Sequence, residues 1–204
     1  YENTSSMSVA AESKGIAPYV RIPELSASHI LRTLDTGAHG INIPHVETAN
    51  DVNKIIQYSK YHPLGERGMA PSTRAGKYTL KTNKKILKKE NDETLVVLLL
   101  ESEGSLDNVE EMIDIEGVDV IYIGPYDLSQ AMGLPGEVDH PDVLNNMERI
   151  FSIVNKSGKI AGSFANTPQR AKRLKNLGIN YLTCETDGTL LRSAFDELKN
   201  QIMN

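Results

Sequence analysis

Two carboxylates in this chain each stand at the end of an apolar, strand-like run. Glu101 closes the run TLVVLLLE, and Asp127 closes the run VDVIYIGPYD. If the two strands are parallel neighbours, both side chains emerge at the carboxyl-terminal edge of one sheet, where α/β folds bind their ligands. Carboxylate oxygens are the ligands that hard divalent cations prefer. The pair therefore predicts a divalent-metal site at this edge; the alternative for either residue is that it only caps the following helix.

The elements that must position this pair alternate strictly along the chain. Apolar runs predict strands at residues 17–22, 40–46, 94–101, 118–127, 159–165 and 181–186. Helical periodicity predicts helices at residues 26–35, 48–60, 105–115, 139–157, 167–178 and 189–202. Strands that are each followed by a helix indicate a parallel sheet with right-handed crossovers. Two folds remain open: a doubly wound sheet, or a (β/α)₈ barrel that lacks its first two units.

Two of these helices have clear start signals. Thr48 is followed three residues later by Asp51, which is typical of an N-terminal cap with a compensating acid. Thr167 precedes a proline at the first helical position. We expect both helices to begin at these threonines.

Composition limits the class of protein. The chain has 204 residues, is 39% hydrophobic and carries a formal net charge of -5, which fits one domain over residues 1–204 and argues against a nucleic-acid binder. Its single cysteine, Cys184, excludes an internal disulfide and is interpreted as a buried strand thiol. No apolar stretch is long enough for a membrane span and no signal peptide is evident, so we expect a cytoplasmic protein without membrane contact.

Five sequence blocks decide between the two folds. The blocks are VRIPE at 20–24, LDTGAHGINIPHVET at 34–48, PLGERG at 63–68, ESEGSLDN at 101–108 and EGVDVIYIGPYDLSQAMG at 116–133. Together, and in this order, they resemble the HpcH/HpaI aldolase family, whose members are metal-dependent aldolases that make or break carbon–carbon bonds next to pyruvate. The resemblance runs from about Ile16 to the C-terminal helix.

The resemblance implies a complete architecture. It implies a (β/α)₈ TIM barrel of the phosphoenolpyruvate/pyruvate type, with about the first two βα units missing from this chain. It also implies a homo-oligomer, a hexamer built from dimers that exchange their last helix. The apolar stripe between Leu190 and Ile202 suits such an exchange, although a helix packed on its own barrel would show the same stripe.

Particular residues match the family's site. Glu101 and Asp127 match its two metal-binding carboxylates, which hold Mg²⁺, Mn²⁺ or Co²⁺. Arg21 matches the arginine that binds the pyruvate carbonyl or enolate oxygen, a task that suits a permanently charged guanidinium. In the GPYD turn, Gly124 allows close approach and the N–H of Tyr126 occupies the pyruvate-binding position.

The proton-transfer residues are matched only in part. Asp35 matches a family aspartate that is linked to the transition state through a histidine in an upstream D-x-E-H motif. That motif has no counterpart in this sequence. His45 is the one histidine placed plausibly at the sheet edge, and we interpret it as solvated or structural rather than catalytic.

Other positions depart from the family or suggest specificity. Leu99 replaces a glutamine that commonly donates to the substrate, and Tyr126 is bulkier than the small residue often found there. Arg67 and Arg74 lie in a Gly/Pro-rich segment, residues 61–92, that interrupts the alternation. They are candidates to reach an acidic tail on the aldehyde or a neighbouring subunit.

The resemblance therefore predicts a divalent-metal-dependent aldolase that reversibly cleaves 4-hydroxy-2-oxo acids to pyruvate and an aldehyde. Its partners would be small 2-oxo acids and aldehydes. One alternative is a carbon–carbon lyase of the citrate lyase β-subunit or malyl-CoA type, against which the blocks PLGERG and GPYDLS argue. The other is a catalytically incomplete barrel fragment that binds metal or a partner subunit without turnover.

Overall fold

The computed structural model describes residues 1–79 and 83–203. Its strands are β1 (Tyr19–Arg21), β2 (Gly40–Ile43), β3 (Leu95–Leu100), β4 (Val120–Ile123), β5 (Ile160–Ala165) and β6 (Tyr181–Cys184). Its helices are α1 (Glu2–Glu12), α2 (Ala27–Asp35), α3 (Ala49–Ser59), α4 (Lys84–Glu93), α5 (Glu103–Asp107), α6 (Val109–Ile113), α7 (Pro125–Ala131), α8 (Pro141–Ser157), α9 (Pro168–Asn176) and α10 (Asp187–Met203). The predicted segment 61–92 includes residues 80–82, which lie outside this description.

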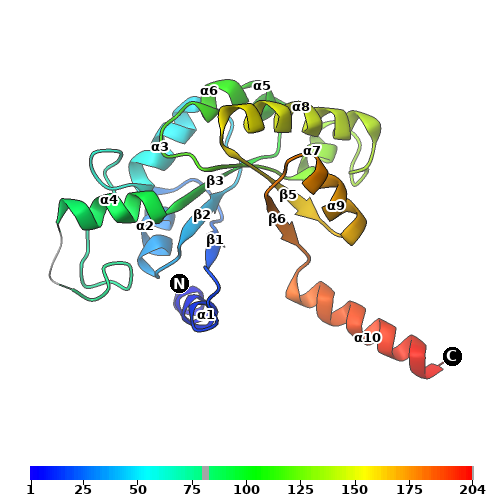
Figure 1. Ribbon diagram of the computed structural model, residues 1–204, viewed down its shortest axis with the longest axis horizontal. Coiled ribbons are helices and arrows are strands. Elements are labelled where there is room, and N and C mark those ends of the chain that lie inside the picture. The colour runs from blue at the N-terminus through cyan, green and yellow to red at the C-terminus, as the bar shows by residue number, and fades with distance from the viewer. Residues whose placement is uncertain (80–82, 204) are drawn as a thin grey trace.

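The six strands form one parallel sheet in the order β1-β2-β3-β4-β5-β6 (Figure 1). This order has no reversal, which a doubly wound sheet requires at its switch point. The sheet is also curled: the Tyr19 ring from β1 lies edge-on to the Tyr181 ring from β6, with centroids 6.3 Å apart. The first and last strands in the order thus meet through side chains on the concave face. The observed fold is a singly wound, curled parallel sheet. The alternation of elements predicted the parallel sheet, and the strand order excludes the doubly wound fold that the alternation had left open.

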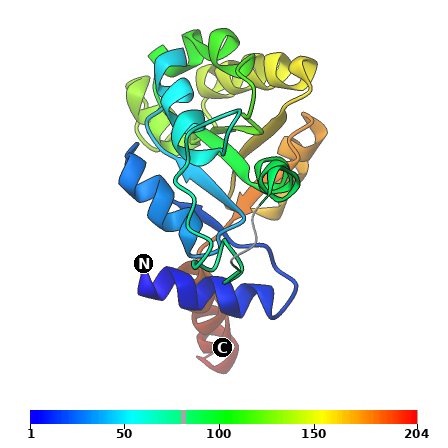
Figure 2. The same ribbon diagram turned by 90° about the vertical axis from the view of Figure 1, so that its left-hand side faces the viewer.

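The two faces of the sheet carry different cores because successive strand residues point to opposite sides. The larger core lies between the strands and the helices, and includes Leu98, Ile121 and Phe151. The concave face holds a smaller cluster of Val97, Leu99, Val120 and Tyr122, against which Phe164 and Tyr181 pack. Figure 2 shows helices of this layer beside the strands from a second direction. One apolar core between the helices and the sheet, and a second core inside the curl, indicate barrel-like packing.

Both predicted helix starts are confirmed. The Thr48 hydroxyl accepts a hydrogen bond from the Asp51 N–H, and the Asp51 carboxylate accepts one from the Thr48 N–H, which completes a capping box at the start of α3. Thr167 accepts from the Arg170 N–H at the start of α9, with Pro168 at the first helical position. These caps fix where the chain leaves β2 and β5.

Three sequence interpretations were wrong. The strand expected at 118–127 ends at Ile123, and Pro125–Ala131 form α7, so Asp127 lies in a helix. The helix expected at 105–115 is two short helices, α5 and α6, separated at Asn108, whose amide donates to the Glu47 carbonyl at 2.9 Å. That long-range contact competes with a continuous helix. Cys184, expected to be buried, is exposed, because β6 is the last strand of the sheet and lacks a neighbour on one side.

Helix α10 stands apart from the rest of the described chain (Figure 1). It has no buried residue over its 17 positions. Along the described residues, no helix combines the length and apolarity that crossing a bilayer requires. The exposed apolar side chains of α10 are Leu190, Leu191, Phe195, Leu198, Ile202 and Met203.

Candidate active site

Glu101 is the centre of a polar group at the carboxyl-terminal edge of the sheet. It directly follows β3, and only 7% of its surface is exposed. Its Oε2 accepts a hydrogen bond from the His45 backbone N–H at 3.2 Å and lies 2.9 Å from the His45 Nδ1. Its Oε1 lies 3.6 Å from the Nη2 of Arg21. The ends of β1, β2 and β3 thus converge on one buried carboxylate.

Asp127 reaches the same place from the next strand. Leu100 pairs with Ile123 in the β3–β4 register, so that Glu101 stands opposite Gly124. A Cβ atom at Gly124 would lie 3.3 Å from the Cγ of Glu101 and 3.6 Å from the Oδ2 of Asp127. The two side chains therefore both border the small space that this glycine leaves open.

The electrostatics of the pair favour a cation. Burial raises the pKa of Glu101, and the negative charge of Asp127 raises it further, against the opposing effects of the His45 backbone N–H and Arg21. A divalent ion beside Glu101 and Asp127 would offset the repulsion between the two carboxylates. The described residues include no group of three or more His, Cys, Asp or Glu side chains arranged to hold a metal. The carboxylate pair fits a metal whose remaining oxygen ligands come from substrate and water.

A cleft of about 270 Å³ opens beside the pair. Next to it, the first turn of α7 presents backbone N–H groups that the helix itself leaves unbonded. Leu99 points its Cδ1 to within 3.4 Å of the position a Gly124 Cβ would occupy, so an apolar wall stands where the family commonly has a donor. The cleft is lined by residues that include His45, Glu47, Glu101, Asp127 and Gln130.

The predicted site residues are not all brought together. Arg21, Glu101, Gly124, Tyr126 and Asp127 lie at the carboxyl-terminal edge. Asp35 lies elsewhere, because α2 carries the chain back to the start of β2 at the amino-terminal edge. There its Oδ1 lies 3.3 Å from an amino group of Arg67, whose side chain is only 2% exposed.

Arg67 and Arg74 also lie at the amino-terminal edge. The Arg67 guanidinium stacks on the Tyr61 ring, 4.7 Å from its centroid, and Arg74 pairs with Glu12. Within one chain, this geometry does not bring either arginine to the carboxyl-terminal edge, where Glu101 lies. A larger cavity of about 780 Å³ opens at this edge, lined by residues that include Gly37, His39, Arg67, Arg74, Glu90 and Thr94.

His45 is the residue whose place sequence reasoning underrated. It has a φ of 54°, in the left-handed region that a bulky residue seldom adopts. This conformation turns both its backbone N–H and its ring toward Glu101. The signal available in the sequence was its place directly after a strand and a proline.

A parallel α/β sheet with a carboxylate pair at its carboxyl-terminal edge defines a class of enzymes that act on ligands at that edge. A family model described as HpcH/HpaI aldolase/citrate lyase matches residues 4–194. The chain belongs to this family, and it is a carbon–carbon lyase of the aldolase type, as predicted.

Named relatives and solved structures agree with this assignment. The chain is 34% identical over 190 residues to the 2-keto-3-deoxy-L-rhamnonate aldolase of Escherichia coli O17:K52:H18, covering 90% of this chain and 70% of the relative. An HpcH/HpaI aldolase from Desulfitobacterium hafniense DCB-2 superposes with a TM-score of 0.91 at 26% identity, covering 97% of this chain and 76% of that one. A family protein from Burkholderia cenocepacia J2315 gives 0.92 at 26%, covering 100% and 80%.

The citrate lyase branch is more distant. The citrate lyase beta subunit from M. tuberculosis superposes with a TM-score of 0.54 at 14% identity, covering 82% of this chain and 67% of that one. This likeness concerns the fold alone.

Proposed function

We propose that this protein is a divalent-metal-dependent aldolase that reversibly cleaves a 4-hydroxy-2-oxo acid into pyruvate and an aldehyde. The observation that carries the proposal is that Glu101 and Asp127 both border the space at Gly124. The metal would be Mg²⁺, Mn²⁺ or Co²⁺, held by these two carboxylates. When bound, such an ion supplies the Lewis acid that polarises the 2-oxo group.

The surrounding groups divide the work of holding pyruvate. The side chain of Arg21 is 57% exposed and forms an ion pair with Glu101. Its remaining N–H groups would donate to an enolate oxygen. The N–H of Tyr126, in the first turn of α7, would bind the pyruvate carboxylate. His45 holds the carboxylate of Glu101 in one orientation through two contacts. With Leu99 in place of a donor, pyruvate would rely on fewer polar contacts.

Asp35 is retained as a proposed catalytic residue, with one condition from the geometry. It lies at the sheet edge opposite to Glu101 and pairs with Arg67. A direct role would require the amino-terminal edge of one copy to meet the carboxyl-terminal edge of another. We propose that the homo-oligomer implied by the family resemblance brings these two edges together.

The proposed architecture extends the observed sheet to a (β/α)₈ barrel, of which this chain shows six βα units. The exposed apolar stripe of α10 supports its exchange between subunits, because a stripe of this size is costly to leave in water. Size-exclusion chromatography with light scattering of the protein and of Phe195→Glu would test this. A monomer for the unmodified protein would contradict it.

The test of function is metal-dependent decarboxylation of oxaloacetate, which generates the pyruvate enolate without needing an aldehyde. We expect activity with Mg²⁺ or Mn²⁺ and loss on chelation. Glu101→Gln and Asp127→Asn should lose it, while Glu103→Gln, an exposed neighbour in α5, should retain it. Metal-independent activity that survives both substitutions would overturn the proposal.

A further inference from the structure

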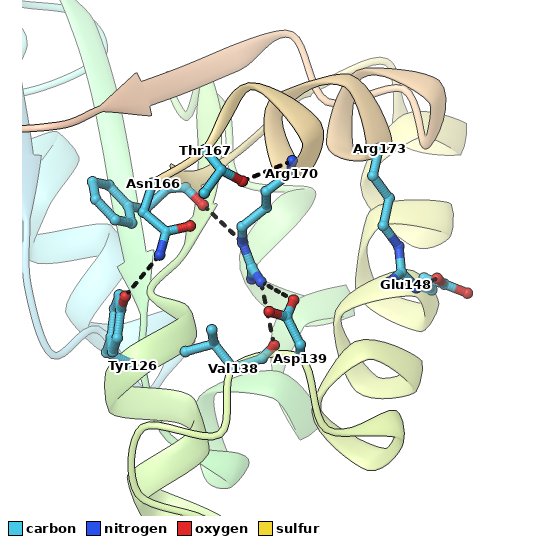
Figure 3. Close-up of polar contacts among 9 residues, drawn as sticks. Tyr126, Val138, Asp139, Glu148, Asn166, Thr167, Arg170 and Arg173 are labelled. Atoms are coloured by element: carbon cyan, nitrogen blue, oxygen red, sulfur yellow. Dashed lines mark hydrogen bonds and ion pairs between the residues drawn. The ribbon is translucent and has the colours of Figure 1, made fainter. Parts of the chain in front are cut away.

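The side chains of Tyr126 and Asn166 form a polar pair at the carboxyl-terminal edge (Figure 3). The reaction proposed at Glu101 does not require these two side chains. Tyr126 precedes Asp127 in α7, and Asn166 follows β5. The Asn166 amide donates to the Tyr126 hydroxyl at 3.3 Å. The Tyr126 ring packs on Phe164, with centroids 6.0 Å apart, which turns the phenol toward β5. The pair thus lies one rim position beyond the proposed metal ligands.

The chemistry of the pair suits hydroxyl groups. A phenol that accepts a hydrogen bond from Asn166 keeps its own proton to donate. The Asn166 carbonyl and its second N–H add an acceptor and a donor. Both residues are uncharged and exposed, with 46% of Tyr126 accessible. Such groups recognise neutral hydroxyls better than they recognise a carboxylate or phosphate.

A buried arginine holds the pair in place (Figure 3). Arg170 is 7% exposed and lies beneath the turn that carries Asn166. Its Nε donates to the Phe164 carbonyl at 3.3 Å, and its Nη1 lies 2.5 Å from the Asp139 Oδ1 and 3.5 Å from the Val138 carbonyl. It therefore ties the end of β5 to the loop that follows α7. Because Asn166 directly follows β5 and Tyr126 lies in α7, this connection fixes the distance between the two residues.

We infer that Tyr126 and Asn166 are specificity-determining residues that bind hydroxyl groups on the aldehyde part of the substrate, and that Arg170 is their positioning residue. The inference rests on the proposed function, because it assigns the pair to the aldehyde side of that reaction. It predicts a preference for a polyhydroxylated aldehyde over an unsubstituted one of equal carbon count.

The test compares glyceraldehyde with propanal as acceptors for pyruvate, with Mn²⁺ present. The measured quantity is the ratio of their kcat/KM values. Tyr126→Phe keeps the ring on Phe164 and removes the hydroxyl, and it should lower the ratio about tenfold, as expected for one lost hydrogen bond in a site. Asn166→Ala should lower it to a similar extent, and the double variant little further, because the two groups act as one unit.

The matched control is on the same helix. Arg173 of α9 forms an exposed ion pair with Glu148 at 3.4 Å (Figure 3). Arg170→Lys cannot reach both the Phe164 carbonyl and Asp139 with its one nitrogen, so it should lower the ratio about threefold. Arg173→Lys should leave the ratio unchanged. If Arg170→Lys fails to fold, the Tyr126→Phe ratio still decides the proposal.

The two proposals fail in different ways. Equal losses on both aldehydes, or no loss on either, would overturn the role of the pair while metal-dependent oxaloacetate decarboxylation by the unmodified protein upholds the reaction. Absence of that decarboxylation would overturn the reaction and the role of the pair with it. A lowered ratio in Tyr78→Phe, an exposed tyrosine at the opposite edge, would also contradict the inference.

Discussion

Two buried cations at the amino-terminal edge of the sheet have partners within the fold, whereas two carboxylates at the carboxyl-terminal edge both border the space at Gly124. Lys60 donates to the Asn91 carbonyl at 2.7 Å and to the Thr94 carbonyl at 2.5 Å, and Arg67 pairs with Asp35. At the other edge, burial raises the pKa of Glu101 and the negative charge of Asp127 raises it further. The same sheet thus uses charge for cohesion at one edge and leaves it available for a ligand at the other.

Cavity size alone would favour the amino-terminal edge as the functional site. The cavity at the amino-terminal edge, about 780 Å³, is larger than the cleft beside Glu101, about 270 Å³. Its arginines, however, already form ion pairs with Asp35 and Glu12, although the Nε of Arg67 has no hydrogen-bond partner. A functional site needs groups whose interactions are incomplete without the ligand, and the carboxylate pair meets that condition.

The largest effect expected from this comparison is at Glu101. Glu101→Gln should lower kcat/KM for cleavage of a 4-hydroxy-2-oxo acid by roughly 10³-fold, since metal binding and enolate stabilisation each contribute several kcal/mol. The free energy of unfolding should stay the same or rise, because burial disfavours the ionised form that Gln replaces. Paired kinetics and urea unfolding would check both. A loss of stability that accompanies the loss of activity would show that Glu101 serves the fold.

The reverse outcome is expected at Lys60. Lys60→Met keeps the volume but leaves the carbonyls of Asn91 and Thr94 without their donor, at a cost of about 3 kcal/mol in the free energy of unfolding. The kcat of the folded enzyme should not change. Lys88→Met, at an exposed pair with Asp92, is the control and should cost less than about 0.5 kcal/mol. A large fall in kcat for Lys60→Met would break the distinction between the two edges.

Local signals in the sequence were sufficient for most of the fold. The caps at Thr48 and Thr167 depend on residues three positions away, so they were readable. The break at Asn108 depends on a carbonyl 61 residues distant, and the exposure of Cys184 depends on which strand is last in the sheet. Both are tertiary facts that no local window contains.

The site was predictable where strand ends defined it. Glu101, Asp127 and Arg21 each follow or end a strand, and parallel strands bring such positions to one edge. Asp35 ends a helix, and the helix of a βαβ unit returns the chain to the opposite edge, so topology alone could have separated it from the others. The left-handed backbone that turns His45 to Glu101 had no local signal beyond the preceding proline.

The smallest expected effect concerns Tyr122, which lies between the two edges on the concave face. Its hydroxyl is 2.5 Å from the Thr183 hydroxyl and its ring lies edge-on to Tyr181. Burial raises the pKa of Tyr122 from 10.0 to about 12. The folded state therefore binds the phenolic proton more tightly than the unfolded state. This contribution to stability is fully present below pH 10 and is lost as the pH rises through about 12.

The size of this loss can be measured against a variant without the phenol. Between pH 9 and about pH 11.5, the free energy of unfolding of the unmodified protein should fall by about 2 kcal/mol more than that of Tyr122→Phe. Urea unfolding at both pH values would give the difference, with Tyr78→Phe, an exposed tyrosine, as the control for general alkaline effects. If Tyr122→Phe loses as much stability as the unmodified protein over this range, the concave core admits water and does not form the closed interior that separates the two edges.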